Sequence, residues 1–196
     1  MKEKPILFSG KMVRAILDDR KTMTRRVVKP QPEQDTDCPY HIGTGIERKA
    51  RICPYGKPGD RLWVRETFAE GLSNKEGIAY RATSKWYDFE DGTPENFKEI
   101  KWKPSIFMPR WASRITLEIT NVRVERLQDI SEEDAKREGV ESNFDEGVVY
   151  YGPLNKGHAD ARIAFSWLWD SINAKRGYSW ESNPWVWVVE FKRIKE

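Results

Sequence analysis

The sequence predicts an α+β protein in which a small curled β-sheet or barrel is flanked by helices. Two observations lead to this class. Strand-like and helical segments alternate irregularly along the chain, in the order strand, helix, several strands, two helices and a strand. The longest strand-like segment also changes the phase of its apolar residues partway along, which is common where sheets curl.

The first three elements are short. "KPILFS" (4–9) is typical of a strand, and "TMTRRVV" (22–28) is rich in β-branched residues and is expected to be extended. Between them the sequence predicts a helix that ends near Asp18 and Asp19. This helix has apolar residues at helical spacing, namely Met12, Val13, Ile16 and Leu17.

The middle of the chain holds one clear strand between two insertions. "GDRLWVRETF" (59–68) predicts a turn and then a strand whose alternating residues face opposite ways. Leu62, Val64 and Glu66 would share one face of it. Segments 28–58 and 70–105 lack sustained periodicity and are interpreted as insertions, the second with a short strand at "IAYRAT" (78–83).

"SRITLEITNVRVERL" (113–127) is the strongest strand signal in the chain. Its apolar residues alternate up to Ile119 and then change phase, so that Val122 and Val124 continue the pattern. A shift of one residue moves side chains to the other face of a sheet. We therefore expect a β-bulge or a sharp bend at Thr120–Asn121.

Two helices and a strand complete the pattern. "SEEDAKREG" predicts a short helix capped by Ser131 and ended by Gly139, and 141–158 is expected to be a loop. Segment 159–177 predicts a longer amphipathic helix ended by Gly177, and "PWVWVVEFKRI" (184–194) a closing strand. The longer helix is expected to pack through Ile163, Ala164, Trp167, Leu168 and Ile172.

Composition predicts one soluble domain spanning residues 1–196. Charged residues make up 33% of the 196 residues and hydrophobic residues 38%. No apolar run approaches the roughly 20 residues that span a bilayer, so no membrane partner is expected. Two cysteines do not form a disulfide framework, and a cytoplasmic location is expected. Sequence leaves the oligomeric state open.

Positive charge is concentrated at the N-terminal end. Residues 1–65 carry 15 Lys and Arg against 8 Asp and Glu, a net charge of +7, whereas the remainder carries 19 against 23, or −4. "ILDDRKTMTRR" (16–26) contains four of these cations around two threonines. Such a cluster is typical of a solvated helix end or a phosphate-binding surface. It is also compatible with a site in which Lys21 or Thr24 does chemistry.

Several stretches resemble the ASCH domain family, and in particular its branch encoded by phages and prophages. The resemblance is carried by "AILDDRKTMTRR", "CPYGKPGDRLWVRE", "WKPSIFMPRWASRITLEI", "ISEEDAKREGV" and "WVWVVEFKRI". Its core covers 5–27, 59–68, 114–140 and 184–194, together a little over a third of the chain. The resemblance implies a PUA-like β-barrel that binds RNA or a modified nucleoside.

Compact bacterial members of this family hydrolyse the acetyl amide of N4-acetylcytidine with a lysine, a threonine and a glutamate. Their motif, G-R-K-T-x-T-x-R, is matched here by "DRKTMTRR" (19–26). The resemblance therefore implies that Lys21, Thr24 and Glu138 form a catalytic triad and that Arg26 positions the substrate. The motif has a glycine where this chain has Asp19. A turn with positive φ tolerates aspartate less well than glycine, though better than most other residues.

The implied chemistry is reasonable for these residue types. A threonine hydroxyl needs a neighbour to accept its proton, and a lysine can do so if burial or nearby cations lower its pKa. Further substrate contacts are expected from Arg20, next to Lys21, and from the strand residues Trp63, Arg65 and Glu66, which combine an aromatic face, a forked donor and a carboxylate.

Two alternatives to hydrolysis remain at this stage. The same cations and aromatics suit an RNA-binding module without turnover, and Lys and Arg beside a hydroxyl would also suit a ribonuclease. No cofactor is expected. The chain has two Cys and two His residues but only one short spacing, Cys38 to His41, and structural zinc sites usually contain two close pairs. No metal site is therefore predicted.

Overall fold

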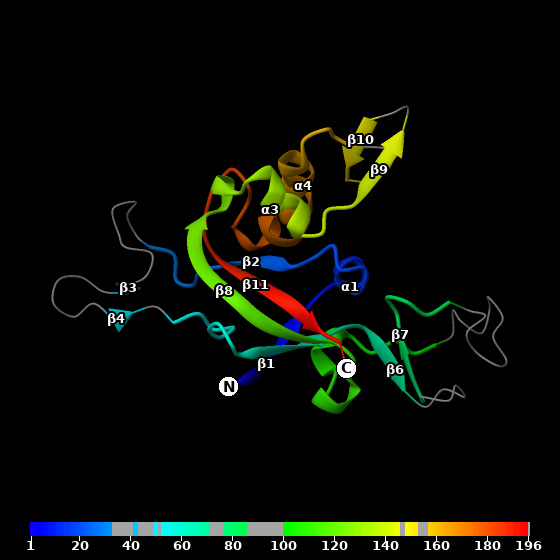
Figure 1. Cartoon of the computed structure of the whole chain (residues 1–196). Coiled ribbons are helices and arrows are strands. Elements are labelled where there is room, and N and C mark those ends of the chain that lie inside the picture. Colours follow the sequence, from blue (N-terminus) through cyan, green and yellow to red (C-terminus); the bar gives the residue numbers. More distant parts are fainter. Residues whose placement is uncertain are drawn as a thin grey trace.

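A curved five-stranded sheet forms the centre of the molecule, and helices pack against both of its faces (Figure 1). The computed structural model describes residues 1–32, 41–42, 49–50, 52–70, 77–85, 100–145, 148–152 and 157–195. The prediction of an α+β class is confirmed.

The sheet has the strand order β1-β5-β8-β11-β2. Its strands β1 and β5 run parallel, and all other neighbours in the sheet are antiparallel. The bounds are Glu3–Leu7 for β1, Met23–Val27 for β2, Arg61–Arg65 for β5, Thr116–Arg126 for β8 and Trp185–Ile194 for β11.

The sheet curls without closing into a continuous barrel. Its edge strands are β1 and β2, and among the described residues no strand pairing joins them. A side chain crosses the gap instead, because Arg26 on β2 donates a hydrogen bond of 2.7 Å to the carbonyl of Leu7 on β1. The unpaired edge of β2 is therefore left available to a ligand.

The phase change expected in β8 is a β-bulge. Along β11, Glu190 lies opposite Asn121 and the next residue, Phe191, lies opposite Ile119. Thr120 is thus the extra residue, and the prediction at Thr120–Asn121 is confirmed. The bulge increases the local twist of the β8–β11 pair.

Three two-stranded ribbons extend from the sheet. Strands β6 (Phe68–Glu70) and β7 (Ile78–Tyr80) form one, and the short strands β3 (His41–Ile42) and β4 (Lys49–Ala50) form another. The third, β9 (Ser142–Asp145) with β10 (Val148–Tyr151), occupies a segment expected to be a loop. That expectation was wrong because cross-strand pairing, rather than apolar alternation, specifies this ribbon.

Helix α1 (Gly10–Leu17) ends where its periodicity predicted. Asp19 then adopts a φ of 56°, in the left-handed region that favours glycine. The backbone N–H groups of Arg20 and Lys21 both donate to the Ala15 carbonyl at 2.9 Å. This tight turn directs the chain from α1 into β2.

Helix α3 (Glu132–Arg137) is capped as expected. The Ser131 hydroxyl accepts a hydrogen bond of 3.0 Å from the backbone N–H of Asp134. Gly139 ends the helix with a φ of 84°, and Glu138 is its C-cap residue. The position of Glu138 is therefore set by the end of α3 on one side and by the turn at Gly139 on the other.

The packed face of helix α4 (Ala161–Asn173) was predicted only in part: Ala164 is buried as expected and Leu168 is partly buried. Ala161, Ala164, Phe165 and Trp169 are its buried residues. Three of the residues expected to pack, Ile163, Trp167 and Ile172, are 37%, 43% and 38% exposed. Apolar residues occur around most of this helix, so periodicity alone does not select the packed face.

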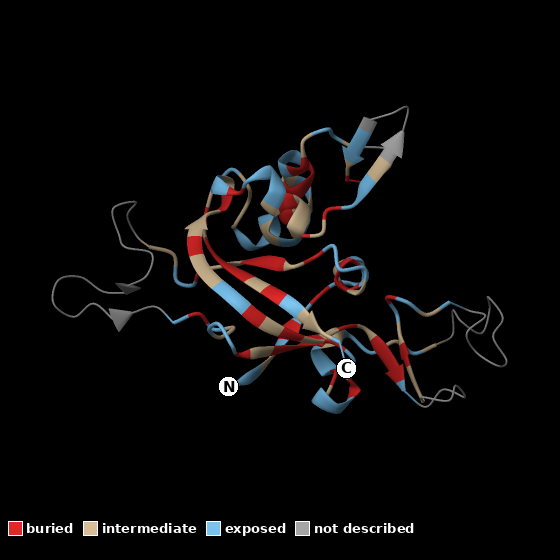
Figure 2. Cartoon of the chain, viewed as in Figure 1, coloured by how far each residue is buried: buried red, intermediate tan, exposed pale blue. Residues whose placement is uncertain are grey.

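Strand β11 is buried on both faces, because it lies between two hydrophobic cores (Figure 2). Trp187, Val189 and Phe191 enter a first core that β1, β5, β8 and α1 also line. Val186 and Val188 enter a second core beneath α3 and α4.

Candidate functional site

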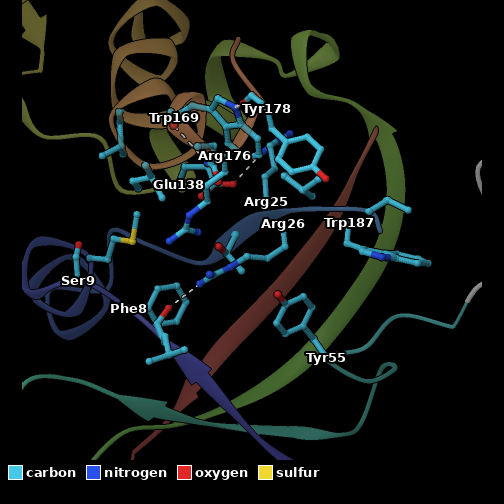
Figure 3. A pocket seen from close by; sticks show the side chains of 18 of the residues that line it. Phe8, Ser9, Arg25, Arg26, Tyr55, Glu138, Trp169, Arg176, Tyr178 and Trp187 are labelled. Carbon is cyan, nitrogen blue, oxygen red and sulfur yellow. Dashed lines mark hydrogen bonds and ion pairs between the residues drawn. The ribbon is translucent and has the colours of Figure 1, made fainter. Parts of the chain in front are cut away.

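A pocket of about 760 Å³ lies along the unpaired edge of β2. One wall is formed by the end of β1, and others by the turn at Pro54–Tyr55 and by the C-terminal half of α4 with the turn that follows it (Figure 3). Its volume falls within the range of about 300–1,000 Å³ that is typical of small-molecule sites.

The edge of β2 presents backbone groups to this pocket. At the two ends of β2, the Thr22 carbonyl accepts from the Phe191 N–H of β11 at 2.8 Å and the Val28 N–H donates to the Trp185 carbonyl at 3.0 Å, whereas the Thr22 N–H donates to the Arg137 carbonyl at 2.9 Å. Because backbone groups alternate along an antiparallel strand, those of Arg25 and Val27 point away from β11. Among the described residues, no strand pairs with these N–H and C=O groups at the border of the pocket.

Lys21 and Glu138 form a buried pair. The Lys21 ammonium donates to the Glu138 carboxylate Oε2 and to the Glu138 backbone carbonyl, both at 2.7 Å. Lys21 is 2% exposed and Glu138 is 4% exposed. The prediction that the chain would bring a glutamate to Lys21 thus corresponds to a direct contact in the structure.

Burial lowers the pKa of Lys21 below its ordinary value of 10.5. The charge and hydrogen bond of Glu138 oppose this shift, while the charges of Arg26 and Arg25 add to it. Two of the three positions around Nζ are occupied by Glu138 oxygens. A neutral lysine amine that donates its two N–H groups to these oxygens has its lone pair free to accept a further proton.

Thr24 is the only side chain of the expected triad that is without a hydrogen bond in the described part of the chain. It lies on β2, is 3% exposed and lines the same pocket as Glu138. A buried hydroxyl that faces a cavity is available to hydrogen-bond or attack a ligand. Lys21 lies behind this surface, because it is not among the lining residues.

Arg25 anchors the carboxylate side of the site, and the sequence analysis did not identify it. It bonds Glu138 at 3.3 Å, Asp134 at 2.9 Å, and also Glu125. Its side chain is fully buried. Arg25 therefore holds Glu138 from the side opposite Lys21.

Arg26 projects between two aromatic rings. Its guanidinium carbon lies 5.2 Å from the centre of Phe8 and 5.9 Å from that of Tyr55, as Figure 3 shows. One Nη donates to Leu7, whereas its buried Nε has no hydrogen-bond partner among the described residues. Burial lowers the pKa of Arg26, and the charge of Arg176 adds to this effect.

The rest of the lining is aromatic and basic. Tyr178 lies 5.3 Å below the Lys29 ammonium, measured to the ring centre. The aromatic members of the lining are Phe8, Tyr55, Phe165, Trp169, Tyr178 and Trp187. The cationic members are Arg25, Arg26, Lys29 and Arg176. Flat rings beside cations suit a planar, electron-rich ligand.

The structure places the remaining predicted substrate-binding residues away from this pocket. Arg20 is exposed and pairs with Asp18 at 3.0 Å. On β5, the Arg65 guanidinium stacks 4.7 Å from the centre of the Trp63 ring. Glu66 is buried in a two-fold contact with Arg114, at 2.9 and 3.0 Å. None of these four predicted residues lines the pocket, although Thr67, directly after Glu66, does.

Tyr55 and Arg176 are among the lining residues that were missed, because they are distant in sequence from the basic motif. Tyr55 belongs to "CPYGKPGD". The sequence indicated only a turn within an insertion there and gave no sign of a binding residue. Arg176 belongs to "AKRG" at the end of the α4 segment, where a basic residue has an ordinary explanation in helix termination. Only the folded chain brings them to β2.

Two further classes of site were sought in the described residues. No group of three or more His, Cys, Asp and Glu residues there is arranged to hold a metal ion. Cys38 lies outside the described residues. None of the described helices combines the length and apolar character needed to cross a bilayer.

Comparisons with known proteins give one structural likeness. No family model matches the sequence, and no curated protein matches it. Among solved structures, the chain is similar to the crystal structure of an ASCH domain from Lactobacillus crispatus JV V101. The match covers 98% of this chain and 79% of that one, at 15% identity and a TM-score of 0.43.

Proposed function

We propose that the pocket binds the base of a modified nucleoside or RNA and hydrolyses an acyl amide on its exocyclic nitrogen, as in N4-acetylcytidine. The observation that carries this proposal is the buried Lys21–Glu138 pair, which adjoins a pocket lined by the Thr24 hydroxyl. Nucleophilic catalysis needs a hydroxyl and a base of lowered pKa at one site, and Thr24 lines the same pocket as Glu138, the partner of Lys21.

The pocket walls support recognition of a nucleobase. Tyr55 and Tyr178, which are only partly buried, offer faces on which a base can stack, and the edge of β2 that faces away from β11 offers backbone donors and acceptors to its polar edge. Strand edges bind extended or planar ligands through such groups without rearrangement. The Thr24 side chain lies on this same strand.

The proposed reaction has two halves. The Thr24 hydroxyl gives its proton to neutral Lys21 Nζ while its oxygen attacks the acyl carbon, and the resulting oxyanion is stabilised by the Arg26 guanidinium. The C–N bond then breaks, and Lys21 returns the proton to the departing amine of the base. Water, deprotonated by Lys21, attacks the Thr24 ester, and carboxylic acid and free hydroxyl are released.

Glu138 acts through Lys21 in this scheme. Its carboxylate and its backbone carbonyl accept hydrogen bonds from two N–H groups of the Lys21 amine. The lone pair of the neutral amine then points away from Glu138. Arg25 in turn holds the carboxylate. Glu138 is therefore a positioning residue, and its replacement by Gln should shift the pH profile of turnover as well as lower its rate.

The test is turnover of N4-acetylcytidine by wild type, Thr24→Val and Lys21→Met. Thr67→Val is the matched control, because it makes the same change in a threonine that also lines the pocket. We expect both site variants to lose at least 10²-fold in kcat/KM and the control to stay within about threefold. Thr24→Val removes a hydroxyl with no partner in the described chain and should change stability by less than about 0.5 kcal/mol.

A second function, binding of RNA without turnover, is favoured by the basic and aromatic lining of the pocket. If folded wild type does not hydrolyse the acetyl amide yet binds RNA oligomers with a steep salt dependence, this function replaces the first. Cleavage of the oligomers themselves would instead indicate a ribonuclease.

A further inference from the structure

The described part of the pocket lining carries more positive charge than its carboxylate can neutralise. Among the described residues that line the pocket there are four cations, and Glu138 is the one carboxylate. Glu138 already bonds Lys21 and Arg25, and Arg25 is itself engaged by Glu125 and Asp134. The charges of Arg26, Arg176 and Lys29 are left facing the pocket.

From this arrangement we infer a phosphate subsite between Arg26 on β2 and Arg176 in the 3₁₀ turn after α4, so that the ligand is a nucleotide or an RNA strand and not a free nucleoside. The inference deepens the proposed function and rests on it for the identity of the base. The subsite itself stands on the two guanidinium groups.

Arg26 supplies a guanidinium group whose hydrogen-bond donors are only partly used. One Nη donates to the Leu7 carbonyl, and its Nε lacks a partner in the described chain. Among the described residues it forms no ion pair. An arginine whose donors are incompletely used, at the edge of a cavity, binds a phosphate oxygen with charge-assisted hydrogen bonds.

Arg176 approaches Arg26 from another wall. The two residues line one pocket, and they are close enough that the charge of Arg176 lowers the pKa of Arg26. Arg176 has no carboxylate partner among the described residues. Two like charges that face a common cavity repel each other, and a bound anion relieves that repulsion.

Lys29 extends the same positive region. Its ammonium group stacks on Tyr178, which also lines the pocket, in the segment that follows Arg176. The pocket volume of about 760 Å³ leaves space for more than a single base. A base between the aromatic walls and a phosphate between the arginines would together occupy it.

The first experiment measures binding without turnover. Cytidine, cytidine 5′-monophosphate and cytidine 3′-monophosphate are titrated into wild type, Arg176→Ala and Lys175→Ala, with tryptophan fluorescence or calorimetry as the readout. Lys175→Ala is the matched control because Lys175 is an exposed neighbour that does not line the pocket. We expect at least one monophosphate to bind about tenfold tighter than cytidine.

Arg176→Ala should abolish this preference and leave the affinity for cytidine within about twofold, and Lys175→Ala should retain it. Equal affinities for cytidine and both monophosphates in wild type would overturn the subsite, as would a loss that Lys175→Ala shares. Because these ligands carry no acyl group, the result is independent of whether the protein is a hydrolase.

A second arm distinguishes the sources of phosphate. N4-acetylcytidine, its monophosphates and a short single-stranded RNA with one internal N4-acetylcytidine are compared as substrates and as ligands. Tighter binding of the oligomer than of both monophosphates, with a salt slope of about −0.7 for each phosphate contacted, indicates an RNA strand. The reverse order indicates a free nucleotide. Preference for the unphosphorylated nucleoside would refute the inference while leaving the hydrolase proposal intact.

Discussion

The Lys21 ammonium has no exposed surface, so its protonation is linked to folding. A lysine whose pKa is lowered in the folded state binds fewer protons there than in the unfolded chain. Stability then rises with pH between the lowered folded pKa and the ordinary value of 10.5. Each unit of that interval contributes about 1.4 kcal/mol.

We therefore predict that the stability difference between wild type and Lys21→Met changes in favour of wild type as pH rises from 7 toward 10. Urea unfolding at several pH values measures it, and other titrating groups are common to both proteins. If turnover is present, its kcat/KM should rise over the same interval. A difference that is constant with pH would mean that Lys21 keeps its proton.

Asp19 gives a second prediction at this scale, because its φ of 56° costs a residue with a Cβ about 1 kcal/mol relative to glycine. Asp19→Gly and Asp19→Ala both remove the exposed contacts with Lys195 and Arg193. We expect the glycine variant to be about 1 kcal/mol more stable than the alanine variant in urea. Equal stability would show that the turn relaxes.

At the residue scale, the motif predicted the local part of the site. Lys21 and Thr24 lie within one short segment, so their resemblance to a known pattern was visible without the fold. Arg25 looked like one more basic residue, although its four contacts come from β2, β8 and α3. Such contacts depend on pairing partners about a hundred residues away, which a linear pattern does not contain.

At the scale of elements, Gly139 couples α3 to the turn that holds Lys21. A Cβ at this position would lie 2.9 Å from the Cβ atoms of both Ala15 and Lys21, and φ is 84°. We predict that Gly139→Ala destabilises the protein by about 2–4 kcal/mol through overpacking and backbone strain. Thermal or urea unfolding measures this loss.

Gly177 provides the matched control for that prediction. Its φ is 83°, yet a Cβ there would meet nothing within 4 Å. Gly177→Ala should therefore cost only the strain, about 1 kcal/mol. Similar losses in the two variants would mean that the contact with Lys21 relaxes freely and that Gly139 has no special role in placing the lysine.

Elements were predicted best where a single physical rule determined them. The cap of α3 and the bulge in β8 follow from residue type and from period, and both are confirmed. The packed face of α4 was predicted only in part, because its aromatic and aliphatic residues surround the helix. The ribbon β9–β10 was missed because its strands follow from mutual pairing.

At the scale of the whole molecule, the two cores share β11, so neither can be lost alone. Val186 and Val188 belong to one core, and Trp187 and Val189 to the other. We predict a single cooperative transition in urea, with coincident changes in far-ultraviolet circular dichroism and tryptophan fluorescence. Trp187 belongs to the first core and Trp169 to the second, so Trp187→Phe and Trp169→Phe each remove the fluorescence of the buried tryptophan of one core. Different unfolding midpoints in the two variants' fluorescence and circular dichroism would contradict a single domain.

The pairing of β2 with β11 also sets the order in which the site can appear during synthesis. Thr24 lies opposite Val189, and among the strands of the sheet β11 is the sole neighbour of β2. A nascent chain on the ribosome contains Lys21, Thr24 and Glu138 long before it contains the strand that aligns them. We expect a chain truncated before β11 to carry all three residues and no assembled pocket, so ligand binding reports that synthesis has passed β11.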